Sequence, residues 1–174
     1  MSAFLRCVTV SVCLAALPAC AHAAPPTSAS PAPQGQMPRL SAANTIAMCL
    51  QRLDDPAQGR DCPGEYRIAC MRLSADGETN AGMLRCTREE VAAWQARLDT
   101  TQAQLSARLD PEPARHLSEA QQAWAAMRDA DCVYRASLYG GGSHAALEQA
   151  LCQLQATADR TLLLRSWDDA VRND

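Results

Sequence analysis

The sequence predicts an all-α fold, a small disulfide-stapled helical bundle in which a long helix packs against an antiparallel helical hairpin. Three observations lead to this prediction. Apolar residues recur at helical spacing in several stretches, and no stretch alternates with period two. A run of three glycines, Gly140 to Gly142, separates two of these stretches. Six of the nine cysteines follow residue 23, and this even number favours disulfides.

Residues 1–23 have the features of a signal peptide. Arg6 supplies a short basic region, residues 7–17 are apolar, and Ala21-His22-Ala23 is a small-x-small cleavage pattern. We therefore expect cleavage before Ala24 and export to the periplasm or the medium, where disulfides form. A lipid anchor at Cys20 is the alternative, although Pro18 occupies a position where lipoprotein motifs prefer a small residue. No later stretch approaches the roughly 20 apolar residues of a membrane span.

The charge after cleavage is mildly acidic. Removing Arg6 leaves 15 arginines and no lysine against 19 acidic residues, a net charge of −4. Nucleic acid is an unsuitable partner for such a surface, since phosphates need a basic footprint, whereas a basic protein is compatible with it. There is no Cys-x2-Cys, and His116 and His144 lie at no zinc-binding spacing from a cysteine pair, so we expect no metal or other cofactor.

The first part of the mature chain is predicted to be a linker and a cysteine-rich segment. Residues 24–39 are rich in Pro, Ala and Ser, a composition typical of a disordered tether. Residues 40–85 follow as a short helical segment, with helices expected over 41–53 and 65–73 on either side of a turn at Cys62-Pro63-Gly64. Its short pieces favour stabilisation by disulfides over a large core.

A long helix is expected over residues 87–109. Thr87 and Glu90 have the spacing of a capping box, which predicts that the helix begins there. One face then carries apolar side chains: Val91, Trp94, Leu98, Leu105 and Leu109. Pro111 and Pro113 are expected to end this helix.

The hairpin is predicted from residue 114 to residue 165. Its first arm covers 114–139, and Ser143 is placed to cap the second arm. Cys132 lies eight residues before Gly140 and Cys152 nine after Ser143, or about 12 and 13.5 Å from the turn at 1.5 Å per residue. The two cysteines therefore stand at similar heights and are expected to form a disulfide. Residues 168–174 are polar and expected to fray.

The same counting brings polar and aromatic side chains together lower in the hairpin. Arg160 is level with residues 123 and 124, so it should meet Gln121 and Trp124. Arg128, one turn after Trp124, can stack on the indole or pair along the helix. Asp129 is expected to pair with an arginine, because Asp129 and Asp131 project in different directions and do not form a catalytic pair. These residues are predicted to hold the two arms together.

The turn at residues 140–144 lacks the marks of a catalytic site. Ser143 and His144 are adjacent and have no Gly-x-Ser-x-Gly elbow around them. The glycine run has neither the lysine nor the preceding strand of a phosphate-binding loop, and a turn with left-handed backbone angles accounts for it. We therefore expect a protein that is not an enzyme.

The hairpin motif resembles that of a known family. The pattern is Leu117-x3-Gln121-x2-Trp124-x3-Arg128-Asp129-x2-Cys132, a Gly-Gly-Ser143 turn, and Cys152-x4-Thr157-x2-Arg160-x3-Leu164. It is similar to the LprI-type lysozyme-inhibitor domain of small exported bacterial proteins, over residues 86–164 of an expected domain at 86–167. Gln95, Asp99 and Gln102 depart from it, since relatives have Asp, Asn and Tyr on that helix.

The resemblance also bears on the other cysteines. The family's earlier cysteine pair is best matched by Cys70 and Cys86, which would leave Cys49 to pair with Cys62. Three arrangements of these four cysteines remain open, and only the Cys132–Cys152 bridge follows from the hairpin geometry.

The resemblance implies an exported inhibitor of lysozyme-type peptidoglycan hydrolases that acts by protein–protein binding. The partner would be lysozyme or another basic envelope protein, and the candidate contact is the loop formed by Gly140, Gly141, Gly142, Ser143 and His144. The alternative is a periplasmic helical interaction or scaffold module without lysozyme activity. The sequence leaves the oligomeric state open.

Overall fold

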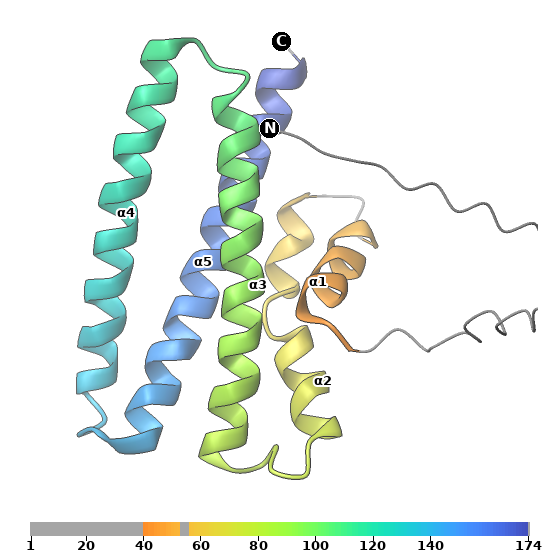
Figure 1. Cartoon of the computed structure of the whole chain (residues 1–174), viewed down its shortest axis with the longest axis vertical. Helices are drawn as coiled ribbons and strands as arrows, with labels where there is room; N and C mark the ends of the chain where they lie inside the picture. The colour runs from red at the N-terminus through yellow and green to blue at the C-terminus, as the bar shows by residue number, and fades with distance from the viewer. Residues whose placement is uncertain (1–39, 53–55, 174) are drawn as a thin grey trace, which may run out of the picture. The chain divides into compact units, whose positions relative to one another are not determined.

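The computed structural model describes residues 40–52 and 56–173, which belong to one compact unit, Met37–Asp174 (Figure 1). The expected signal peptide and linker lie outside the described residues. The elements are α1 (Ala42–Gln51), the 3-10 helix η1 (Pro56–Asp61), α2 (Glu65–Leu73), α3 (Asn80–Ser106), α4 (Pro111–Ser137) and α5 (Gly142–Asn173). Within these ranges the chain is helical with no strand, which confirms the all-α prediction.

Three long helices form the body of the bundle, and α5 packs against both of the others. Helix α5 packs against α3, α4 and η1, while α1 and α2 pack on α3. In Figure 1, α4 and the pair α1 and α2 lie on opposite sides of α3. The antiparallel α4–α5 hairpin and the long helix beside it agree with the predicted architecture. None of the helices that the structure describes combines the length and apolar character needed to cross a bilayer.

Helix α3 begins seven residues before the predicted start, so the prediction that Thr87 and Glu90 form its capping box is wrong. Thr79 is the N-cap, and its hydroxyl accepts a hydrogen bond from the Gly82 amide at 3.0 Å. Thr87 lies inside the helix and donates to the Met83 carbonyl at 2.7 Å. Because both Thr87 and Glu90 are fully buried, neither is available to cap an exposed helix end. The helix also continues across the domain boundary that was expected between residues 85 and 86.

The prolines at 111 and 113 open a helix rather than close one. Helix α3 ends at Ser106, and α4 begins at Pro111 behind the N-cap Asp110. Proline is suited to the first helical turn because its missing N–H has no partner there and its φ is already helical. The first arm of the hairpin therefore starts three residues before the expected residue 114.

The C-terminal residues 168–173 are the last turns of α5 and not a frayed tail. Asp168 is buried, and its Oδ1 atom lies 2.6 Å from Nη1 of Arg108, which follows the end of α3. Val171 packs on a core cluster that contains Leu105 and Leu164. These contacts hold the end of the helix, a result that the polar composition of the segment did not predict.

The core is divided into clusters along α3. Trp94, fully buried as expected, joins α1, α3 and α5 in a cluster with Ile46 and Leu154. The next cluster lies toward the α3–α4 connection and contains Leu98, Leu105, Leu117 and Leu164. A smaller one surrounds the α2–α3 contact and contains Tyr66 with two disulfide cysteines. Helix α1 therefore contributes Ile46, Cys49 and Leu50 to the core, and α2 contributes Tyr66 and Cys70.

Candidate functional site

The tip of the α4–α5 hairpin is an exposed glycine turn. Gly140, Gly141 and Gly142 have φ values of 69°, 91° and 77°, a left-handed region that favours glycine. A Cβ added at any of the three would meet nothing within 4 Å, so their conformation and not close packing calls for glycine. Ser143 and His144 follow and are both exposed.

A disulfide lies behind the tip. Cys132 on α4 and Cys152 on α5 are joined as expected, with Cα atoms 5.4 Å apart. Cys132 is fully buried between the helices. Since the bridge closes a loop of about 20 residues, it restrains both arms close to the turn.

Side chains at the tip make contacts that the sequence did not predict. Helix α5 begins at Gly142, so Ser143 lies in its first turn, and the expected capping role for Ser143 is not observed. Its hydroxyl instead accepts a hydrogen bond from Nδ2 of Asn80, at the start of α3, at 3.2 Å. The His144 ring lies edge-on to Tyr139, with centroids 4.9 Å apart. The tip is thus attached to a third helix, and Ser143 and His144 do not form a nucleophile–base pair.

Polar and aromatic side chains connect the arms farther from the tip. Nε of Arg160 donates to Oε1 of Gln121 at 2.5 Å, and its guanidinium carbon lies 5.7 Å from the Trp124 ring centroid. Arg128 lies over the same ring at 5.0 Å and pairs with Asp129. These are the contacts expected from the residue spacing. Their role here is to hold the helices together.

The residues that depart from the family pattern take part in this network. Arg128 donates to Oε1 of Gln95 at 2.8 Å and to Thr157 at 3.1 Å, so it connects α4 to α3 and α5. Gln102 accepts from Gln121 at 3.3 Å. Amides at 95 and 102 therefore supply neutral acceptors on α3.

Three other polar or aromatic side chains of the hairpin lie apart from one another. Asp131 is exposed on α4. His116 is exposed near the start of α4, between Glu112 and Glu119. Trp167 is 41 % exposed and stacks with Arg160 at 5.3 Å. The structure brings none of these three side chains to the hairpin tip.

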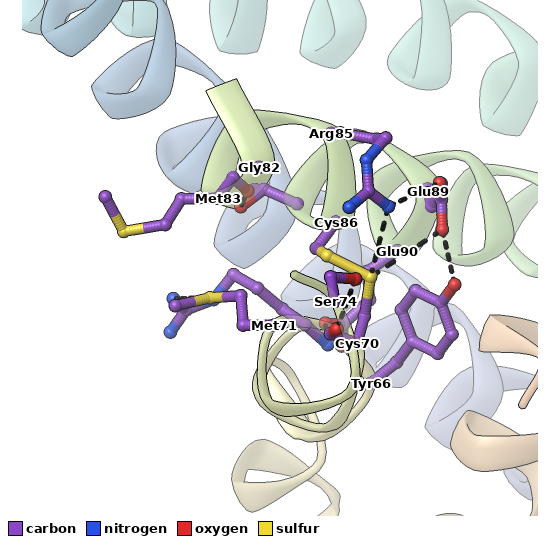
Figure 2. The surroundings of a disulfide bond; sticks show 12 residues. Tyr66, Cys70, Met71, Ser74, Gly82, Met83, Arg85, Cys86, Glu89 and Glu90 are labelled. Atoms are coloured by element: carbon purple, nitrogen blue, oxygen red, sulfur yellow. Dashed lines mark hydrogen bonds and ion pairs between the residues drawn. A yellow bond between two sulfur atoms is a disulfide. The ribbon is translucent and has the colours of Figure 1, made fainter. Parts of the chain in front are cut away.

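Of the other two disulfides, one joins α1 to the connection between η1 and α2, and the other joins α2 to α3. Cys49 is bonded to Cys62, and Cys70 on α2 to Cys86 on α3, which are the pairs that the resemblance implied. Figure 2 shows the second bridge with Arg85 and Glu89 beside it on α3. Tyr66 donates a hydrogen bond to Glu89, and burial, followed by this carboxylate, raises the pKa of Tyr66 to about 12.

Glu90 is a structural residue whose role the sequence did not reveal. Its two oxygens accept hydrogen bonds from the backbone N–H of Gly64 at 2.7 Å and of Arg67 at 2.8 Å. These donors are the N-cap residue and the third residue of α2. Glu90 therefore caps α2 from α3. Burial raises the pKa of its carboxyl, and the two backbone donors oppose that shift. The available signal was an acidic residue on the same helical face as Trp94 and Leu98.

Comparison with known proteins gives a match to one family model. The model is described as Lysozyme inhibitor LprI, and it matches residues 70–164, which are 95 of the 174 residues. This chain belongs to the LprI lysozyme inhibitor family. The match begins at Cys70, earlier than the expected Cys86, so the family domain includes the disulfide between α2 and α3. Searches of curated proteins and of solved structures found no match.

Membership of the LprI family agrees with the three disulfides in pointing to an extracytoplasmic protein, because such bonds persist in oxidising compartments. It also supports a general role in lysozyme inhibition.

Proposed function

We propose that the protein binds a lysozyme-type peptidoglycan hydrolase through the hairpin tip, residues 140–144, and blocks its cleft without catalysis. The observation that carries this proposal is a narrow, exposed turn at the end of two helices cross-linked by Cys132–Cys152. Because the disulfide restrains the two arms behind the turn, less conformational entropy is lost on binding, which favours affinity. The His144 imidazole supplies a polar group that can reach acidic residues in a cleft.

Exposed apolar side chains next to the tip support a protein partner. Tyr134 and Leu138 are 67 % and 65 % exposed, and Tyr139 is 44 % exposed. Tyrosine is enriched at protein interfaces because it combines a large apolar area with a hydroxyl group. These three residues lie at the end of α4 and in the turn, so one partner can contact them and the glycine loop together.

Export would bring the protein to the compartment of its proposed partner. Cleavage before Ala24 would release the protein into the periplasm or the medium, where peptidoglycan hydrolases act. The lipid-anchored form at Cys20 would leave the same domain outside the cytoplasm. Mass spectrometry of the protein from its native host distinguishes the two by the mature N-terminus.

The test is inhibition of cell-wall lysis by lysozymes of different classes. We expect His144→Ala, or deletion of two of the three glycines, to weaken inhibition by about tenfold or more, as for an interface hot spot. His116→Ala is the matched control, because it removes another exposed histidine of the hairpin from a site away from the tip. It should inhibit like the unmodified protein.

Two results would count against the proposal, and they have different meanings. Unchanged inhibition by correctly folded tip variants would exclude the tip as the contact while leaving inhibition in place. No inhibition of any lysozyme class by the oxidised protein would favour the alternative, a helical interaction or scaffold module of the envelope.

A further inference from the structure

A groove between α1 and α3 lies away from the hairpin tip. Its volume is about 340 Å³, and it is lined by Ala43, Ile46, Ala93, Ala96, Arg97, Thr100, Thr101 and Gln104. This volume is near the lower end of the roughly 300–1,000 Å³ that small-molecule sites occupy. Asn80, which contacts the tip, precedes Ala93 by 13 residues, or about 20 Å along α3. The groove is therefore separate from the proposed lysozyme contact.

The groove contains a cation that lacks an ionic partner. No carboxylate among the described residues lies within 4.0 Å of the guanidinium nitrogens of Arg97 or Arg165. Asp169, one turn after Arg165, pairs with Arg172 instead. Burial, followed by the nearby charge of Arg165, lowers the pKa of Arg97. Arg97 is thus a partly buried cation without an ionic partner, and an anion in the groove would supply one.

The other lining residues restrict the kind of anion. Ala43, Ile46, Ala93 and Ala96 provide an apolar wall. The hydroxyls of Thr100 and Thr101 donate to the carbonyls of Ala96 and Arg97, so their hydrogens are already used. Of the lining side chains, the Arg97 guanidinium and the Gln104 amide still have N–H groups without a hydrogen bond to the residues that the structure describes.

We propose that this groove binds a small organic carboxylate, with its anionic group on Arg97 and its apolar part against the α1–α3 wall. Arginine is suited to this role because its planar fork matches a carboxylate with two parallel hydrogen bonds. The alanines leave space where larger side chains would fill the groove. This binding function is independent of lysozyme inhibition.

The test is titration of the isotope-labelled, oxidised protein with three probes, followed by NMR. Hexanoate carries both features, hexanamide only the apolar chain, and inorganic phosphate only the charge. Hexanoate should cause saturable shifts at the Arg97 side chain and at the amides of residues 93–104. Its dissociation constant should be at least about tenfold lower than those of the other two probes, as expected for a charge-assisted pair in a partly apolar site.

Variants locate the binding. Arg97→Gln should weaken hexanoate binding. Arg88→Gln, on the opposite face of α3 by helical geometry, should leave it unchanged. Ala96→Leu keeps the Arg97 cation and fills part of the groove, so it should also weaken binding, and it serves as the test if Arg97→Gln does not fold. Lysis assays with Arg97→Gln should show unaltered inhibition.

Several results would overturn the proposal: no saturable shift with any probe, equal binding of hexanamide and hexanoate, or undiminished hexanoate binding by folded Arg97→Gln. If inorganic phosphate bound as tightly as hexanoate, the proposal that the ligand is an organic carboxylate would be overturned.

Discussion

Helix α2 and the α4–α5 hairpin both rely on a buried or partly buried charge, and they satisfy it with different groups. The fully buried Glu90 carboxylate accepts from two backbone amides at the N-terminus of α2. In the hairpin, Arg160 donates to the Gln121 side chain and makes cation–π contacts with Trp124 and with Trp167. The first arrangement depends on one residue, whereas the second is spread over several.

The difference follows from helix length. Helix α2 has nine residues, fewer than the roughly 12–15 at which an isolated helix becomes even marginally stable in water. It therefore needs the Cys70–Cys86 bond and the Glu90 cap. Helices α4 and α5 have 27 and 32 residues and bury leucines against each other and α3. For the hairpin, a single polar contact matters less.

Removal of a disulfide is expected to have the largest effect on the free energy of unfolding. It should also distinguish α2 from the α4–α5 hairpin most clearly. The Cys70–Cys86 and Cys132–Cys152 loops span 16 and 20 residues, so each bond should contribute about 3 kcal/mol to the free energy of unfolding. Urea unfolding of the two double alanine variants measures this. Hydrogen exchange should show α2 opening locally only when Cys70–Cys86 is removed. Equal local protection of α2 in both variants would contradict the comparison.

Glu90→Ala should have the next largest effect. It leaves the buried N–H of Gly64 and the partly buried N–H of Arg67 without their acceptor, at an expected cost of about 2 kcal/mol. The midpoint of urea unfolding gives the value. Glu89→Ala is the matched control on the adjacent, more exposed carboxylate, and it should cost less. A larger loss from Glu89 than from Glu90 would show that the cap is not what holds α2.

Arg160→Met is expected to cost less, about 1 kcal/mol. Methionine keeps an unbranched apolar stem, while the cation–π contacts and the bond to Gln121 are lost. Pairing Arg160→Met with Gln121→Ala in a double-mutant cycle isolates their coupling. A loss greater than that of Glu90→Ala would mean that the hairpin, too, depends on one residue.

The smallest expected effect is the contribution of Glu90 to the pH dependence of the unfolding free energy. Its pKa is raised above 4.5 in the folded protein, so its contribution to stability is fully present below about pH 4.5 and is lost as the pH rises through the folded pKa. Unfolding free energies at pH 4.5 and pH 7 should therefore differ in this sense between the unmodified protein and Glu90→Gln, which does not titrate. Identical pH profiles for the two proteins would show that the cap titrates as it does in the unfolded chain.

Much of the hairpin could be predicted from local patterns. The glycine run marked the turn, and counting residues at 1.5 Å each placed Cys132 opposite Cys152 and Arg160 beside Gln121 and Trp124. Such counting works because two long helices joined by a short turn leave little freedom in register. The contact of Ser143 with Asn80 could not be found this way, since the two residues are 63 positions apart on separate elements.

The sequence alone determined that the chain is helical, where the hairpin turns and which cysteines face each other across it, because these features depend on local periodicity. Only the tertiary structure decided where α3 begins and which helix Glu90 caps. A threonine and a glutamate three residues apart have the same spacing whether they end their own helix or lie inside it. Burial decides between these two cases, because packing brings the N-terminus of α2 to the Glu90 carboxylate. Packing in the same way brings Arg108 to the Asp168 carboxylate, so the end of α5 is held in place.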